Sequence, residues 1–309
     1  MLHFLKWLLK SERSSLVIVL LILMHVVLFE APAEQTYQSK LRPYKVPLNE
    51  HHTPINKNLR HRVIPKQFYV NEASEEPRGN SYSGTAWAFN NNGKWVTARH
   101  VIDDCKKPIY LAIPSKKTRS KEYLKKQGSN SILKVTKVKL VDEHTNYDLA
   151  ILSGGISARY ISISDKINGL DAIGMEAYGM GFPNGEPGDA HLQLIGSSEA
   201  LYKKRSLKEP VFAWAIKSKP NLQSLGGISG GPLLDKNGNS VGTATVENRR
   251  RGRLYASRPS SIKTFITENG YKAAIQNNDM KINNTNYILK GDALRKAHAI
   301  AKVICIRNT

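Results

Sequence analysis

Short strand-like segments, separated by tight-turn residues, recur along the chain from Ser81 to Val246. They carry β-branched, aromatic or alternating apolar residues, and clusters such as Asn90–Gly93 and Lys236–Asn239 separate them. The segments are Ser81–Phe89, Trp95–Arg99, Ile109–Ile113, Val135–Val141, Asp148–Leu152, Glu176–Met180, Val211–Ile216, Pro232–Leu234 and Val241–Val246. No long amphipathic helical pattern intervenes. The pattern therefore favours an antiparallel all-β fold over β-α-β units, with barrels or a sandwich removing the exposed sheet edges.

The composition supports a folded core and leaves a large positive charge to explain. The 309 residues are 40% hydrophobic and 8% aromatic, which excludes a wholly disordered chain, a collagen-like repeat and a disulfide-dense miniprotein. Lys and Arg number 46 against 25 Asp and Glu, so the formal net charge is +21. The two cysteines, Cys105 and Cys305, are too few for a zinc cluster and allow at most one intramolecular disulfide.

The N-terminal residues predict export. An apolar run from Leu16 to Phe29 follows basic residues, and Ala31-Pro32-Ala33 has the small residues that a signal peptidase requires. The run is short for a membrane span of about 20 residues, although the apolar residues of the preceding segment extend it. Residues 1–33 are thus a cleaved signal peptide or a retained signal-anchor, and residues 34–65 form a linker. His51 and His52 lack further ligands nearby, so we predict no metal site.

The strongest motif is Gly227-Ile228-Ser229-Gly230-Gly231-Pro232. A nucleophilic serine must lie on a tight loop, where backbone N–H groups converge on the oxyanion that develops during the reaction. Glycines allow the main chain to approach that closely. The motif therefore predicts Ser229 as a nucleophile, whereas an ordinary glycine-rich hairpin turn is the alternative.

Two upstream motifs supply the groups that activate a serine hydroxyl. His100 follows the apolar segment that begins at Trp95, and Asp148 directly precedes the apolar segment Leu149–Leu152. A serine hydroxyl needs a base within hydrogen-bond reach, and the imidazole needs a carboxylate that fixes its tautomer. The chain order His, Asp, Ser is that of the chymotrypsin arrangement.

Other acids and histidines fit these roles less well. Asp103, Asp104, Asp142 and Glu143 are not followed by an apolar strand. We expect His144 and His191 to be solvated, because both lie in polar, loop-like stretches.

Together, the three motifs resemble those of the trypsin-like (chymotrypsin-fold) serine proteases, and among these the bacterial single-chain HtrA-like branch. Weaker matches lie at Gly84–Phe89, Gly179–Gly185 and Val241–Ala244, so the resemblance covers roughly Val63 to Asn269. It implies an all-β fold of two antiparallel β-barrels packed face to face. His100 and Asp148 would come from the first barrel and Ser229 from the second.

The resemblance also implies the reaction. His100 acts as general base and then acid, Asp148 orients it, and Ser229 is the nucleophile. The backbone N–H groups of Gly227 and Ser229 form the oxyanion hole. A protein or peptide substrate lies between the barrels and is hydrolysed through an acyl-enzyme, with no cofactor. For an exported chain of this branch, the expected location is the bacterial periplasm, either membrane-anchored or released.

The residues around the nucleophile depart from the secreted zymogen-type relatives. Ile228 stands where those enzymes carry an aspartate that receives the freed N-terminus, so we predict activity without proteolytic maturation. Gln223 is expected near the base of the primary pocket, with Thr245, Val246 and Glu247 along its wall. Glu247 would either attract a basic side chain or narrow the pocket.

The domain boundaries follow from the same resemblance. We place the protease domain at residues 66–275, with one barrel at about 66–155 and the other at about 171–270. Residues 276–309 form a short C-terminal extension that begins as a helix at Asp292 and is too short for a PDZ domain. In an exported chain Cys105 and Cys305 either form a disulfide or remain as two thiols, with Cys305 on a packed helix face.

The positive charge concentrates in residues 116–121, 202–205 and 249–253. These clusters either keep the protein soluble or bind anionic lipid headgroups or envelope polymers. Nucleic acid conflicts with export, and the clusters lack interleaved aromatic residues. The alternative function is an inactive protease homologue that acts as a basic module binding the cell envelope. Nothing in the sequence specifies an oligomeric state.

Overall fold

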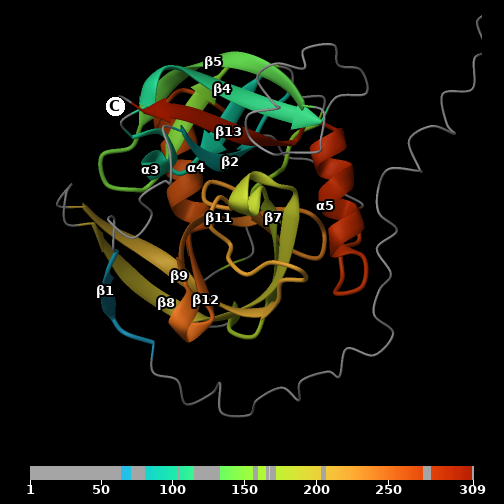
Figure 1. Cartoon of the computed structure of the whole chain (residues 1–309). Coiled ribbons are helices and arrows are strands. Elements are labelled where there is room, and N and C mark those ends of the chain that lie inside the picture. The colour runs from blue at the N-terminus through green and yellow to red at the C-terminus, as the bar shows by residue number, and fades with distance from the viewer. Residues whose placement is uncertain are drawn as a thin grey trace, which may run out of the picture. The chain divides into compact units, whose positions relative to one another are not determined.

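The computed structural model describes the chain from Ile64 onward with several gaps (Figure 1). The described residues are 64–70, 81–103, 105–114, 133–155, 159–164, 167, 172–202, 207–273 and 280–307. The predicted export segment, nearly all of the predicted linker and the basic residues 116–121 and 203–205 lie outside these ranges. Within them, no helix is both long and apolar enough to cross a membrane.

The first barrel is closed by antiparallel strands in the order β13-β2-β3-β6-β5-β4 (Figure 1). These are β2 (Ser81–Ala88), β3 (Lys94–Thr97), β4 (Cys105–Pro114), β5 (Leu133–Glu143), β6 (Ala150–Ser153) and β13 (Ile300–Arg307). Trp95, Leu111 and Val303 are buried in its interior. Closure pairs every strand on both sides, which removes the sheet edges as the short-strand pattern predicts.

The second sheet also closes on itself. Its order is β1-β8-β7-β10-β11-β12-β9, and a further pairing of β8 with β9 completes the ring. Its strands are β1 (Gln67–Tyr69), β7 (Glu176–Gly181), β8 (Gly188–Tyr202), β9 (Leu207–Ser218), β10 (Pro232–Leu234), β11 (Ser240–Asn248) and β12 (Arg253–Ser257). Leu192, Trp214 and Leu254 are buried in its core. The two-barrel architecture expected from the resemblance is therefore present.

Side chains from both barrels join in one apolar cluster. Trp87 and Ile151 come from the first barrel, Met180 and Leu234 from the second, and Phe265 from helix α4 (Pro259–Glu268); all five are buried. Because removing this apolar surface from water is favourable, the shared cluster stabilises the packing of one barrel on the other.

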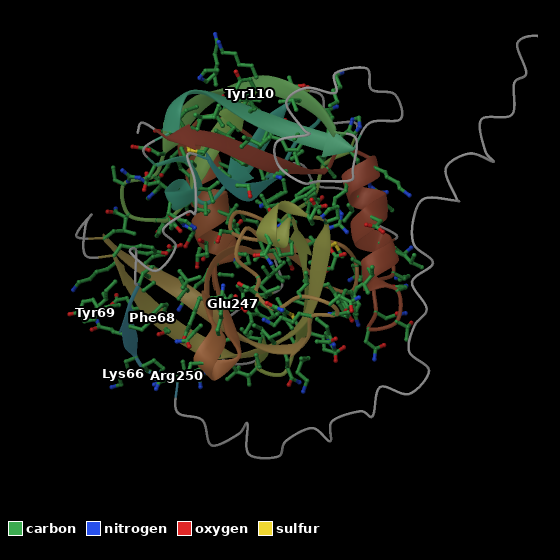
Figure 2. All side chains as sticks on the ribbon, viewed as in Figure 1. Lys66, Phe68, Tyr69, Tyr110, Glu247 and Arg250 are labelled. Carbon is green, nitrogen blue, oxygen red and sulfur yellow. A yellow bond between two sulfur atoms is a disulfide. The ribbon has the colours of Figure 1, made fainter. Side chains whose placement is uncertain are left out.

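The first and last described strands, β1 and β13, pair with other parts of the fold than the predicted domain boundaries assign to them. β1 falls within the residues assigned to the first barrel, but it pairs in parallel with β8 of the second, and Phe68 stacks on Tyr255 of β12 with ring centroids 4.1 Å apart (Figure 2). At the other end, helix α5 (Tyr287–Lys296) is present, but β13 follows it and inserts between β2 and β4. The last described residues thus belong to the first barrel, and Cys305 lies on a strand rather than on a helix face.

The long strand β8 was not predicted, because polar residues interrupt its apolar pattern. Asp189 of β8 is buried. Its Oδ1 accepts from Arg295 Nη1 at 2.8 Å and its Oδ2 from Arg295 Nη2 at 2.7 Å, and Arg295 lies on α5. Gly291 lets the helix approach, since a Cβ at this position would lie 2.4 Å from Asp189 Oδ1. Tertiary contacts here outweigh local strand propensity.

Candidate active site

His100 and Asp148 come together through the pairing of β3 with β6. The register sets Thr97 opposite Ala150, so the residues just beyond β3 meet those just before β6. The chain then turns into the short helix α3 (Arg99–Ile102), and the N–H of Arg99 donates to Asp148 O at 3.2 Å. Each of the two motifs therefore ends or begins a strand at the same edge of the first barrel.

The carboxylate of Asp148 holds both the main chain and the ring of His100. Its Oδ1 accepts from His100 N at 2.9 Å, and its Oδ2 lies 2.6 Å from His100 Nδ1. Asp148 is fully buried, whereas the side chain of His100 is 19% exposed. A proton held on Nδ1 by this contact leaves Nε2 as the proton acceptor of a neutral imidazole.

Thr85 of β2 connects the Ser229 loop to the first barrel. Its N–H donates to Ser229 O at 2.8 Å, and its hydroxyl donates to Gly227 O at 2.8 Å. Gly230 is required here, because its φ of 84° is left-handed and a Cβ would lie 2.1 Å from Thr85 O. Thr85, which the sequence motifs do not include, fixes the Ser229 loop on the barrel that carries His100.

Ser229 is buried, and its Oγ donates to the carbonyl of Thr245 on β11 at 2.9 Å. Among the described residues, no hydrogen bond joins Ser229 to His100, and no acceptor takes the N–H of Gly227 or of Ser229. In contrast, the intervening N–H of Ile228 donates to Leu225 O at 2.9 Å. Among the described residues, the N–H groups of Gly227 and Ser229 thus have no acceptor, whereas the N–H of Ile228 between them has one.

Ile228 is 1% exposed and packs in the core of the second barrel. A Cβ on Gly179 or Gly181 would lie within 3.4 Å of its side chain, so the glycines of β7 leave room for it. Apolar packing therefore anchors the residue before Ser229.

The residues predicted to line the primary pocket differ in exposure. Gln223 is exposed, and Thr245 is buried with its Oγ1 donating to Tyr255 O at 3.1 Å. Val246 is half-buried. Lys219 Nζ donates to both Gln223 O and Glu247 Oε1, at 2.8 and 2.9 Å, so these two residues share a partner, and the pocket wall stays a prediction.

Glu247 is bonded to the segment that leads to Ser229. Its carboxylate accepts from Lys219 Nζ at 2.9 Å, Ser224 Oγ at 2.9 Å and Leu225 N at 2.8 Å (Figure 2). The positive charge of Lys219 compensates the carboxylate, and the three bonds join β11 to the loop that leads to Ser229. Glu247 therefore braces this loop.

The prediction that His144 and His191 are solvated was wrong for both residues. The side chain of His144 is 10% exposed, stacks on Tyr147 and has its Nε2 3.3 Å from Glu268. His191 lies on β8 and has its Nε2 3.2 Å from Glu176. Burial lowers the pKa of His191. Both rings pack against aromatic neighbours contributed by distant parts of the chain, which the polar local sequence does not reveal.

Glu209 lies behind Asp148 and was also missed. It is fully buried on β9, and its Oε2 accepts from Asp148 N at 3.0 Å. Burial, reinforced by the negative charge of Asp148, raises the pKa of Glu209 to about 8. A period-two pattern offered a signal, because Glu209 shares its strand face with the apolar residues Leu207 and Val211.

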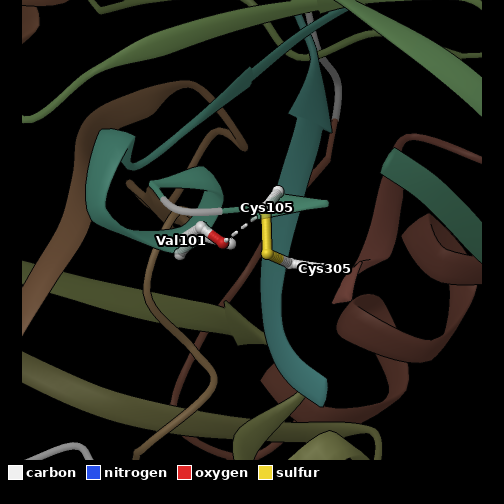
Figure 3. Close-up of a disulfide and its surroundings, with 3 residues drawn as sticks. All are labelled: Val101, Cys105 and Cys305. Atoms are coloured by element: carbon white, nitrogen blue, oxygen red, sulfur yellow. Dashed lines mark hydrogen bonds between the residues drawn. A yellow bond between two sulfur atoms is a disulfide. The ribbon is translucent and has the colours of Figure 1, made fainter. Parts of the chain in front are cut away.

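Cys105 and Cys305 form a disulfide in the structure, with Cα atoms 5.2 Å apart (Figure 3). The sulfur of Cys105 lies 3.7 Å from the carbonyl oxygen of Val101 on α3. The disulfide therefore connects β13 to the segment directly after the helix that carries His100.

Several solved protease structures align with part of this chain. The crystal structure of the Rv3671c protease from M. tuberculosis, active form, aligns with a TM-score of 0.44 and 15% identity, covering 64% of this chain and 78% of that chain. The HtrA-type protease AlgW with a decapeptide gives 0.43 and 18%, covering 61% and 52%. The MamO protease domain from Magnetospirillum magneticum gives 0.41 and 12%, covering 60% and 95%. No curated protein sequence shows a significant match.

The family model for the trypsin-like peptidase domain matches residues 84–242, just over half of the chain. The match includes the strands that position His100 and Asp148, the loop that carries Ser229, and the start of β11. The chain therefore belongs to the trypsin-like peptidase domain family.

Proposed function

We propose that the protein is a serine endopeptidase that hydrolyses peptide bonds with a triad of His100, Asp148 and Ser229. The observation that carries the proposal is the buried Asp148–His100 pair on the first barrel, with the Ser229 main chain bound to Thr85 of the same barrel. A buried carboxylate at 2.6 Å from Nδ1 favours the imidazolium that forms when the ring accepts a proton.

In the proposed cycle, Ser229 Oγ leaves its bond to Thr245 O and attacks the carbonyl carbon of the substrate while its proton passes to His100 Nε2. The C–N bond then breaks as the imidazolium donates that proton to the leaving amine, giving an acyl-enzyme. Water, deprotonated by His100, hydrolyses the ester and restores the Ser229 hydroxyl. Atoms and protons balance without a cofactor.

The N–H groups of Gly227 and Ser229 are the proposed oxyanion hole. Support comes from their lack of an acceptor among the described residues and from the left-handed φ of 93° at Gly227. A Cβ on Gly227 would lie 2.6 Å from Phe182 O, so the loop accepts only glycine at this position without a shift. Losing one such donor typically lowers the rate about 10² to 10³-fold.

A fluorophosphonate probe tests the proposal on the purified full chain. We expect wild type to label without prior cleavage, since Ile228 makes no maturation ion pair, and Ser229→Ala to remain unlabelled. Ser260→Ala is the matched control, because Ser260 is exposed on α4, and it should label like wild type. His100→Ala should label at a rate lower by on the order of 10³-fold or more. Folding of each variant is checked by circular dichroism.

Cleavage of a peptide library by wild type and by Ser229→Ala then defines the substrate. A folded wild type that neither labels nor cleaves would instead favour the non-catalytic basic module.

We also propose that the protein is exported, with Leu16–Phe29 as a signal peptide or a membrane anchor. We further propose that it is attracted to anionic surfaces of the cell envelope. The exposed arginines Arg249–Arg251 support this attraction, whereas Arg253 is buried. Recovery of the full-length chain from the cytoplasmic fraction would contradict export.

A further inference from the structure

The buried carboxyl group of Glu209 contacts three segments of the chain: the Asp148 loop, β8 and β12. Its Oε2 accepts from Asp148 N at 3.0 Å and from the Tyr202 hydroxyl at 3.4 Å, and its Oε1 lies 2.5 Å from Ser257 Oγ. Tyr202 belongs to β8, Glu209 to β9 and Ser257 to β12, so adjacent strands of the second barrel build the site. Asp148 comes from the first barrel. Through this group the second barrel holds the main chain of the triad acid.

The Tyr202 hydroxyl shows how close the two carboxyl groups lie. It is 3.4 Å from Asp148 Oδ2 and 3.4 Å from Glu209 Oε2, and both acids are fully buried. Two buried carboxylates this near to each other repel strongly, so one of them retains its proton. Asp148 receives two bonds from His100, whereas the described hydrogen-bond partners of Glu209 are the Asp148 main chain, Tyr202 and Ser257, none of which is a cation. The negative charge therefore belongs on Asp148 and the proton on Glu209.

We propose that Glu209 is a positioning residue for the triad, which as a neutral acid holds the Asp148 main chain and confines the negative charge to the carboxylate that orients His100. With the proton on Oε1, the acid donates to Ser257 Oγ, and the carbonyl oxygen Oε2 accepts from Asp148 N and Tyr202. This inference rests on the proposed triad function. It adds a group that lies outside the catalytic motifs and touches no reacting atom.

Ionisation of Glu209 would place a second negative charge beside Asp148. The titratable side chains that face Glu209 are Asp148, from the loop between β5 and β6, and Tyr202 of β8; His100 follows through Asp148. Repulsion between two carboxylates would displace Asp148 from the imidazole. We therefore expect the triad to work best while Glu209 is neutral.

Kinetics of three variants test the proposal. Glu209→Gln reproduces the shape and bonding of the neutral acid, so its kcat at neutral pH should stay within about threefold of wild type. Glu209→Leu should lower kcat about 10²-fold with little change in KM, since a small misplacement of the acting groups has that effect. Glu199→Gln, on β8 and bonded to Gln67, is the matched control and should not differ from wild type. In wild type kcat should fall above about pH 8, and in Glu209→Gln it should not.

A readout independent of activity is the NMR signal of the proton on His100 Nδ1, which a short bond to a carboxylate moves far downfield. The signal should persist in Glu209→Gln and vanish or move upfield in Glu209→Leu. If Glu209→Leu does not fold, Ser257→Ala carries the test, since it removes the partner of Oε1 and should weaken the signal in the same direction. Equal loss of kcat in Glu209→Gln and Glu209→Leu, or an unchanged signal in every variant, would overturn the proposal.

The two proposals fail in different ways. A wild type that does not label with the fluorophosphonate, yet shows the downfield signal and its dependence on Glu209, refutes the endopeptidase and leaves the positioning role intact. A wild type that labels and cleaves, with a Glu209→Leu variant that is equally active, refutes the positioning role alone.

Discussion

Reduction of the Cys105–Cys305 disulfide should destabilise the folded chain by several kcal/mol. The two cysteines are 200 residues apart in sequence, so the bond closes a loop that contains most of the described domain. In the chain-entropy treatment, a loop of this length restricts the unfolded state by about 5 kcal/mol. Native-state adjustments lower such values, so we expect a loss of about 3 to 5 kcal/mol in the free energy of unfolding.

Urea denaturation of oxidised and reduced wild type at the same pH measures this difference without changing any side chain. The matched control is the Cys105→Ala/Cys305→Ala double variant, whose midpoint should not respond to the reductant. Hydrogen exchange should locate the effect: after reduction, the amides of β13 should exchange faster, because this strand closes the first barrel between β2 and β4. Equal midpoints for the oxidised and reduced protein, or two free thiols titrated in the unreduced denatured chain, would refute the reasoning.

Two further predictions concern buried charges. Asp189→Asn removes one of the two carboxylates that bind the buried guanidinium of Arg295 and leaves only Asp292, 2.8 Å from Nη2. This should lower the free energy of unfolding by about 3 kcal/mol in denaturant titrations, whereas Asp189→Leu combined with Arg295→Met should recover most of it. If Asp189→Asn has the same free energy of unfolding as wild type, Asp189 does not stabilise the fold by compensating the charge of Arg295. For Glu209, the folded-state pKa of about 8 lies above the ordinary value of 4.5, so the folded chain binds more protons than the unfolded chain between these values and loses stability as pH rises through this window. The loss should be roughly 2 kcal/mol between pH 5 and pH 7 in wild type, and Glu209→Gln, which cannot ionise, should lack this component; the same slope in both proteins would contradict it.

Residues that face each other across distant strands were the least accessible to sequence reasoning. Glu209 is separated from Asp148 by 61 residues, and only the pairing of β8, β9 and β12 brings Tyr202 and Ser257 around it. Glu247 likewise lies 22 residues from Leu225, and its bond to this residue of the loop before Ser229 is apparent only in the folded chain. Local patterns indicate which way a side chain points along a strand, but not which partner it meets.

The sequence alone determined the short strands, the turns between them and the three motifs around His100, Asp148 and Ser229, because each of these depends on residues adjacent in the chain. The tertiary structure decided that β13 completes the first barrel, that Thr85 is bonded to the Ser229 loop, and that Glu209 accepts a hydrogen bond from Asp148 N. These contacts join segments far apart in sequence, and burial makes their strength depend on the surrounding packing. A buried polar group is stable only with its partner, and only the folded barrels bring the partners together.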